Sequence, residues 1–90
     1  MVKNGRKQIV KIEPSSNFIL KITFETGEQR LLFVKPLIKN VTSWSAPILD
    51  PEYFKTASID DDGSLEWPNE FGWDWQTVYD YSMPIEKAKN

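Results

Sequence analysis

One eight-residue segment constrains the fold more than any other part of this 90-residue chain. Between residues 18 and 25, one apolar set of side chains alternates with a more polar set: Phe18, Leu20, Ile22 and Phe24 against Ile19, Lys21, Thr23 and Glu25. Side chains of a β-strand point to opposite faces in turn, and aromatic and β-branched residues are typical of strands. The segment therefore predicts a strand that buries its first set.

A tight turn and a second apolar run follow this strand. A two-residue loop would place the β-branched Thr26 at positive φ, which such residues resist. A three-residue loop over residues 25–27 requires the left-handed region only of Gly27. The register of the resulting hairpin with residues 28–34 predicts two opposed pairs: Leu20 with Leu32, and Phe18 with Val34.

The second face of this hairpin carries Ile19, Leu31 and Phe33. Either a helix covers these side chains or they form an exposed patch. Monomeric proteins rarely leave large apolar patches open. An uncovered face would predict self-association or a partner protein.

A second hairpin is predicted over residues 57–67. A two-residue loop would oppose Ile59 with Glu66, a poor match. A three-residue loop over residues 61–63 gives better pairs: Ile59 with Leu65, and Ala57 with Trp67.

The other elements are short. Residues 8–13 read as a half-buried strand with Val10 and Ile12 on one face, and residues 14–17 as a turn. Residues 35–39 suit a helical turn and residues 40–46 a loop. Pro47, Ile48 and Leu49 suit a brief extended piece.

Two aspartates are predicted to cap helices. Asp50 precedes a helical turn that starts at Pro51 and points Phe54 inward. Asp74 precedes a C-terminal helix with apolar residues at helical spacing, which Pro84 would stop. The expected fold is therefore α+β: a small antiparallel sheet of two hairpins, short helical turns and a C-terminal helix. One domain over residues 7–82 is expected, with 1–6 and 83–90 as flexible termini.

Composition excludes several kinds of chemistry. The chain has no Cys and no His, so it lacks disulfides, thiolates, and the commonest general base and metal ligand. The net charge of −2 argues against a dedicated nucleic-acid binder, and the basic residues near the N-terminus suit a solvated segment. No apolar stretch is long enough to span a membrane, and residues 1–13 do not resemble a signal peptide. We expect a cytoplasmic protein that does not bind membranes.

The acidic run at residues 60–62 invites a calcium interpretation. Aligning Gly63 with the sixth position of an EF-hand loop places Asn69 at the twelfth, where a bidentate carboxylate is required. A hairpin turn explains the run better. No metal or other cofactor is expected.

Catalytic groups are equally sparse. Glu66, Glu70 and Asp74 lie near Trp residues, an environment that can support acid–base chemistry. However, Glu66 is expected to face away from the core, and Asp74 is better explained as a helix cap. Ser and Thr hydroxyls have no His to activate them. We therefore predict no catalytic residues and no enzyme activity.

Four large rings lie within nine residues: Trp67, Phe71, Trp73 and Trp75. Trp67 is expected to seal the end of the sheet. Phe71 and Trp73 fall in a Gly-containing loop, and an exposed Trp73 would suit a partner anchor. Stacking on nucleic-acid bases is the rival use, but no basic groove surrounds these rings. Six residues are thus candidates for binding a partner: Ile19, Leu31, Phe33, Phe71, Trp73 and Trp75.

The order of motifs over residues 7–80 resembles the bacterial family called domain of unknown function 2442. The matching segments are 9–12, 20–24, 27–30, 36–37, 49–54 and 63–69, followed by Asp74 and Tyr79. The chain departs from the family at Glu70, where members often have Gly. It also departs at Phe33, where they usually have a polar residue, often Asp.

The resemblance implies a compact α+β domain without an established enzyme activity. Many such domains are encoded beside the small family called domain of unknown function 4160, an arrangement that resembles a toxin–antitoxin pair. The leading hypothesis is a protein-interaction module, antitoxin-like or regulatory, whose partner is a small toxin-like protein or a second copy. The alternative is a component of a nucleic-acid-linked transcriptional regulator.

Overall fold

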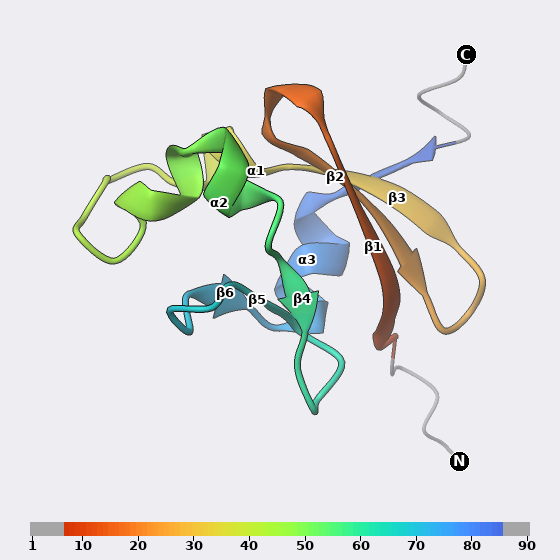
Figure 1. Ribbon diagram of the computed structural model, residues 1–90. Helices are drawn as coiled ribbons and strands as arrows, with labels where there is room; N and C mark the ends of the chain where they lie inside the picture. Colours follow the sequence, from red (N-terminus) through yellow and green to blue (C-terminus); the bar gives the residue numbers. More distant parts are fainter. Residues whose placement is uncertain (1–6, 86–90) are drawn as a thin grey trace.

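Two antiparallel sheets form the framework of the protein in a computed structural model, which describes residues 7–85. The first sheet has the strand order β1-β2-β3-β7 (Figure 1). Its strands span Ile9–Ser15, Ile19–Phe24, Gln29–Phe33 and Met83–Pro84. The second sheet has the order β4-β5-β6 and spans Ser58–Ile59, Leu65–Glu66 and Gly72–Trp73.

Short helices connect and cover these strands. Two are single 3-10 turns, η1 at Ser16–Phe18 and η2 at Ala46–Leu49. Three are α-helical: α1 at Val34–Leu37, α2 at Pro51–Phe54 and α3 at Trp75–Tyr81. The predicted α+β class is confirmed, and α3 lies between the two sheets, in contact with β3 (Figure 1).

The first hairpin has the predicted loop and register. Leu20 lies opposite Leu32, and both are fully buried. The backbone N–H of Phe24 donates to the carbonyl of Glu28 over 2.9 Å, which closes a three-residue loop. Gly27 in this loop has φ +92°, the left-handed conformation that the sequence required of it.

Phe18 does not extend this strand, so its predicted pairing with Val34 is wrong. Phe18 belongs to η1 and has φ +60°, while Val34 already begins α1. The ring of Phe18 instead packs edge-to-face on Phe54 of α2, with centroids 5.2 Å apart. A tertiary contact with a distant helix has overridden the local alternation.

The first strand also departs from prediction at one position. The pairing of β1 with β2 shifts register between Ile9 and Lys11, as at a β-bulge. Ile9 is consequently buried, whereas Val10 is 54% exposed and does not share a buried face with Ile12.

The second hairpin pairs Ile59 with Leu65 as predicted. The carboxylate of Asp60 accepts hydrogen bonds from the backbone N–H groups of Asp62 and Ser64, which explains the acidic turn. The expected pairing of Ala57 with Trp67 is not present, because β4 begins at Ser58 and β5 ends at Glu66. The segment expected to be a loop contains the third strand, β6, because Trp73 pairs with Leu65.

Both predicted helix caps are present. The side chain of Asp50 accepts from the N–H of Glu52 over 3.1 Å, and that of Asp74 from the N–H of Thr77 over 3.0 Å. The expected extended piece at residues 47–49 is instead part of η2. Pro47 stands near the start of this turn, where its missing N–H costs no hydrogen bond.

The chain beyond α3 forms one further strand. The helix ends at Tyr81, and Pro84 is not the residue that stops it. Met83 and Pro84 form β7 opposite Leu31 and Arg30, so the flexible terminus expected from residue 83 begins with a strand. Residues 1–6 and 86–90, also expected to be flexible, lie outside the described part of the chain.

The hydrophobic core lies between the inner face of the first sheet and the remaining elements. It comprises eleven buried residues: Ile9, Leu20, Ile22, Phe24, Leu32, Val34, Ile48, Phe54, Leu65, Trp67 and Val78. Within residues 7–85, no helix is long and apolar enough to cross a membrane.

Candidate interaction surfaces

The outer face of the first sheet carries four apolar side chains that we call the outer patch: Ile19, Leu31, Phe33 and Met83. Ile19 lies directly opposite Phe33, and Leu31 directly opposite Met83, so strand pairing places all four on one face. Phe33 is 41% and Met83 44% exposed, while the other two are half-buried. Among residues 7–85 no helix or strand lies over Phe33 and Met83, so both side chains are exposed in the described part of the chain.

Charged side chains border the outer patch on the same face. The ammonium of Lys11 lies 3.1 Å from the Glu13 carboxylate, and that of Lys21 lies 4.0 Å from it. Such partly exposed pairs contribute little to stability. They give the apolar patch a polar border, which is the usual anatomy of a protein–protein contact surface.

The aromatic segment is packed more tightly than an exposed anchor would be. Trp67 is fully buried, and its indole N–H donates to the carbonyl of Phe54 over 3.0 Å. Phe71 and Trp73 stack edge-to-face with centroids 5.2 Å apart, and both are half-buried, as is Trp75. These three candidates therefore lie mainly against the core, apart from the outer patch.

Trp44 is an exposed ring that the sequence analysis missed. It is 54% exposed and stacks edge-to-face on Phe71, with centroids 5.1 Å apart. Its indole N–H donates to the carbonyl of Asn69, whose side-chain amide donates back to the carbonyl of Trp44. A Trp within an otherwise polar loop was the signal that could have identified it.

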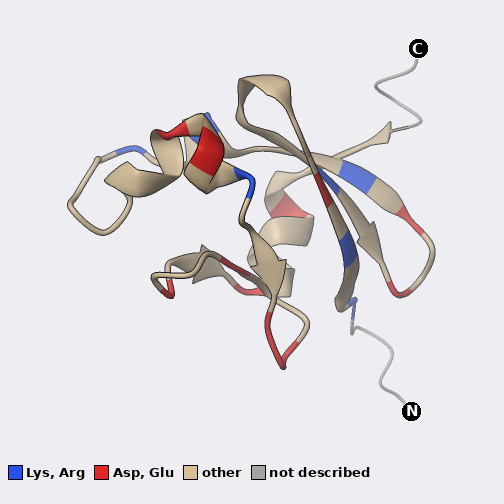
Figure 2. Ribbon diagram, viewed as in Figure 1, with Lys and Arg blue, Asp and Glu red and all other residues tan. Residues whose placement is uncertain are grey.

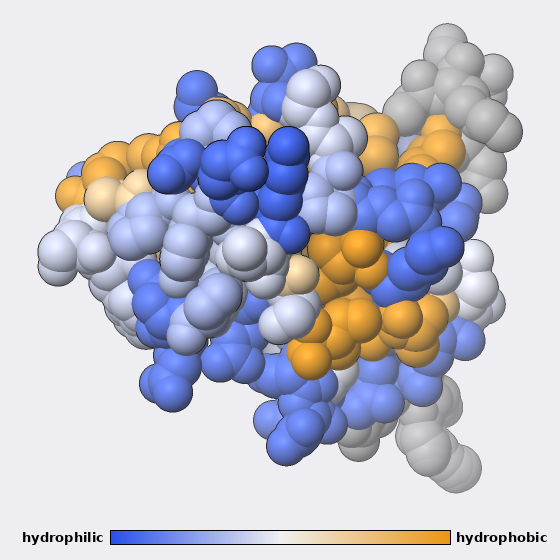
Figure 3. All heavy atoms as spheres, viewed as in Figure 1, coloured by the Kyte–Doolittle hydropathy of each residue, from blue (hydrophilic) through white to orange (hydrophobic). Residues whose placement is uncertain are grey.

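A smaller apolar surface lies where β1 adjoins β4 (Figure 3). Val10 and Ile59, which are 54% and 36% exposed, contribute to it. Val10 was expected to share one face of a half-buried strand with Ile12, and Ile59 to pair with Leu65. The bulge in β1 and the shortness of β4 leave them at the surface instead.

The acidic residues weighed for catalysis do converge in space. Glu66, Glu70 and Asp74 line an open depression of about 420 Å³ beside Trp73, together with Asp60 and Asp62. In the described part of the chain, no three His, Cys, Asp or Glu side chains are arranged to hold a metal ion. Asp60 and Asp74 are already engaged with backbone N–H groups of their own turn and helix.

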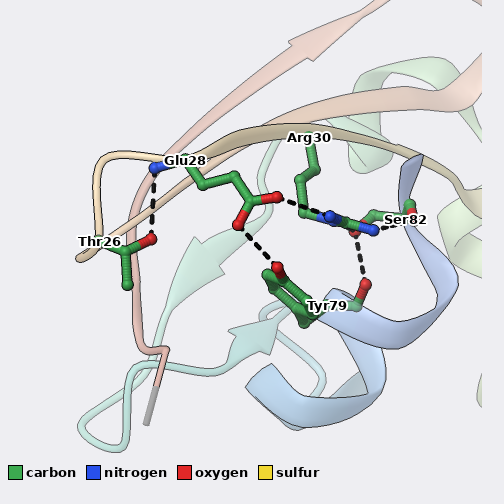
Figure 4. A network of polar contacts seen from close by, with 5 residues as sticks. All are labelled: Thr26, Glu28, Arg30, Tyr79 and Ser82. Atoms are coloured by element: carbon green, nitrogen blue, oxygen red, sulfur yellow. Dashed lines mark hydrogen bonds and ion pairs between the residues drawn. The ribbon is translucent and has the colours of Figure 1, made fainter. Parts of the chain in front are cut away.

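A buried polar network joins β3 to α3 (Figure 4). One carboxylate oxygen of Glu28 accepts from the Tyr79 hydroxyl, and the other from the Arg30 guanidinium, each over 2.7 Å. Arg30, only 9% exposed, also donates to the hydroxyl and the carbonyl oxygen of Ser82. These hydrogen bonds connect β3 and the residue before it to the C-terminal end of α3, so they fasten that end of the helix to the sheet.

The network also shifts two ionisation equilibria. The hydrogen bond from Tyr79, and secondarily the bond from Arg30, hold the pKa of Glu28 below its ordinary value of 4.5. The same bond to Glu28, assisted by burial, raises the pKa of Tyr79. Sequence reasoning could not find this network, because its members are 51 and 52 residues apart along the chain.

These features define a small α+β domain with one hydrophobic core and an open apolar patch on one sheet. The chain belongs to the family described as "Protein of unknown function (DUF2442)", whose model matches residues 9–84. This confirms the resemblance noted from the order of the motifs.

One solved structure is similar over most of the chain. It is the crystal structure of "Putative DNA Binding Protein NE0471" from Nitrosomonas europaea, with 31% sequence identity and a TM-score of 0.71. The alignment covers 93% of this chain and 52% of the other, so this chain spans about half the length of that relative. A comparison with curated proteins finds no match.

Proposed function

We propose that this protein is a non-enzymatic protein-interaction module that binds another protein through the outer patch. The observation that carries the proposal is the exposure of Phe33 and Met83 on a sheet face that no described element covers. The partner would present an apolar strip to the patch and a carboxylate near Lys21. An antitoxin-like or regulatory role fits such a module.

The strands that carry most of the patch are anchored in the core, which favours binding. On their inward side β2 and β3 bury Leu20 and Leu32 completely. A surface that is already folded loses less entropy when a partner docks than one that must first become ordered.

The absence of enzyme activity remains part of the proposal. The carboxylates with the best-defined environments, Glu28 and Asp74, are used in structural hydrogen bonds. Ser64 lines the acidic depression beside Trp73, but its hydroxyl oxygen is engaged in a structural hydrogen bond from the backbone N–H of Trp75.

The test compares two substitutions that each introduce a charge at an exposed apolar residue. Phe33→Asp lies in the outer patch, whereas Val41→Asp, at a residue 58% exposed, lies outside it. Each tagged variant is purified from the source cells, and any complex is sized by light scattering after gel filtration. We expect a stoichiometric partner with the wild type and Val41→Asp that is lost with Phe33→Asp.

Two results would contradict the proposal. One is a wild-type protein that purifies as a monomer without a partner, and the other is a partner that Phe33→Asp retains. A wild-type dimer abolished by Phe33→Asp would assign the patch to a second copy of the chain instead.

The name of the solved relative favours a second candidate function, a component of a nucleic-acid-linked regulator. Basic residues on β1–β3 are interspersed with glutamates, and many acidic residues gather on the second sheet and its loops (Figure 2). Within residues 7–85, this distribution offers phosphates no continuous basic surface. A gel-shift series with DNA and RNA at low salt tests this candidate, and binding that weakens steeply as salt rises would support it.

A further inference from the structure

A cavity of about 590 Å³ lies between the β1–β2 connection and α2. In Figure 1 the orange loop at the top of the sheet, which contains η1, stands beside the green helix α2. Eight residues line the cavity: Pro14, Ser15, Ser16, Asn17, Phe18, Pro51, Phe54 and Lys55. None of them belongs to the outer patch.

Aromatic and proline side chains form the apolar part of this cavity, and Ser15, Ser16 and Asn17 add polar surface. The rings of Phe18 and Phe54 meet edge-to-face within it, and Phe54 is 98% buried, with 2% of its surface exposed. Two prolines, Pro14 and Pro51, add apolar surface on either side. A volume of this size with aromatic and aliphatic walls is characteristic of small-molecule sites.

The polar groups at the cavity favour an anion. Lys55 is the charged residue among those that line it. The ammonium of Lys35 lies 5.3 Å from the centroid of the Phe18 ring, which adds positive charge nearby. The carboxylates of Asp50 and Glu52, although close in sequence, do not line the cavity.

The aromatic wall includes a residue with a strained backbone. Asn17 and Phe18 have φ of 63° and 60°, in the left-handed region that a bulky aromatic residue rarely adopts. This conformation turns the Phe18 ring toward Phe54. Strained residues of this kind concentrate at ligand sites, where the fold holds a shape in readiness.

We infer that this cavity binds a small organic anion. The apolar body of the ligand would lie against Phe18 and Phe54, and its carboxylate or phosphate would pair with Lys55. The inference does not depend on the outer patch, so the two can fail separately.

The test is a titration of the ¹⁵N-labelled protein, followed by amide chemical shifts. The probe is phenylacetate, which combines a ring with a carboxylate. Phenylacetamide supplies the same ring without charge, and inorganic phosphate supplies charge without a ring. We expect saturable shifts at residues 15–18 and 55 with phenylacetate, and weaker binding of the other two.

Variants locate the site. Lys55→Gln should weaken phenylacetate binding by about two- to fivefold, the effect of one exposed ion pair. The matched control Lys39→Gln changes an exposed lysine that does not line the cavity, and should leave binding unchanged. Phe18→Asn should abolish the saturable shifts, because Asn tolerates the left-handed backbone but removes the aromatic wall.

Several outcomes would overturn the inference. They are an absence of saturable shifts in the wild type, equal affinity for phenylacetate and phenylacetamide, or equal losses with Lys55→Gln and Lys39→Gln. Shifts that persist in folded Phe18→Asn would place the probe elsewhere.

Discussion

The hydroxyl of Tyr79 in α3 donates a 2.7 Å hydrogen bond to the carboxylate of Glu28, which lies 51 residues earlier, directly before β3. The same ring stacks edge-to-face on Phe24 and lies beneath the guanidinium of Arg30, 4.2 Å from the ring centroid. Tyr79 thus joins the core to the polar network that fastens the C-terminal helix. Removing its hydroxyl should weaken the fold without creating a large cavity.

Tyr79→Phe is expected to lower the free energy of unfolding by about 1–2 kcal/mol, because a hydrogen bond to a charged group is lost. Urea denaturation near neutral pH measures the change. Tyr81→Phe is the matched control, since Tyr81 is 64% exposed and should lose almost nothing. Equal losses in the two variants would contradict the role assigned to Tyr79.

The same network predicts acid sensitivity. The folded protein lowers the pKa of Glu28, so this carboxylate stabilises the fold fully above its ordinary pKa of 4.5. That contribution is lost as the pH falls through the lowered pKa. Urea denaturation from about pH 7 to about pH 3 should show a smaller acid-induced loss in Tyr79→Phe than in the wild type. If Tyr79→Phe and the wild type lost the same stability between these pH values, the proposed role of the network would be contradicted.

Asp74→Ala should cost about 1 kcal/mol, because the N–H of Thr77 at the start of α3 loses its capping acceptor. Hydrogen bonds with Thr77 also lower the pKa of Asp74, so this cap weakens as acid protonates it. Asp74→Asn keeps an acceptor that does not titrate. It should retain most of the stability at neutral pH, measured by thermal or urea denaturation, and the cap would be in doubt if it matched Asp74→Ala.

Two glycines should respond differently to the same substitution. A Cβ added at Gly27 would contact no atom within 4 Å, so Gly27→Ala is disfavoured only by the left-handed backbone conformation. We expect it to lower the free energy of unfolding by about 1 kcal/mol. A Cβ at Gly72 would lie 2.0 Å from the carbonyl oxygen of Leu65, so Gly72→Ala must displace β6 and should cost about 3 kcal/mol or more. Chemical denaturation compares the two, and the reverse order would contradict the packing of β5 on β6.

Core and surface phenylalanines provide a further comparison. Phe24→Ala should cost about 3–5 kcal/mol, because the ring is fully buried, and so should Trp67→Ala. Phe33→Ala, at a ring 41% exposed, should cost about 1 kcal/mol or less. A large loss at Phe33 would mean that the outer patch is covered in solution.

Much of the local structure could be predicted from the sequence. The alternation through Leu20, Ile22 and Phe24 identified the buried face of β2. The conformational demands of Thr26 and Gly27 selected the loop, and the loop in turn set the register. These predictions succeeded because they depend on interactions among residues that are close in the chain.

Part of the candidate surface was also predictable. The alternation of side chains along the two strands of the first hairpin placed Ile19, Leu31 and Phe33 together on the outer face, as the structure has them. Met83 was missed, because it joins that face only through the pairing of β7 with β3. A strand of two residues is too short to show an alternating pattern in the sequence.

The sequence by itself determined the buried face of β2, the turn that follows it and the two helix caps, since the conformational preferences of Gly27, Asp50 and Asp74 act within a few residues. The tertiary structure alone decided which distant groups meet. It turned Phe18 out of its strand onto Phe54, and it buried Arg30 against Ser82. These contacts join residues up to 52 positions apart, and their energies exist only once the sheets and α3 have assembled around one core.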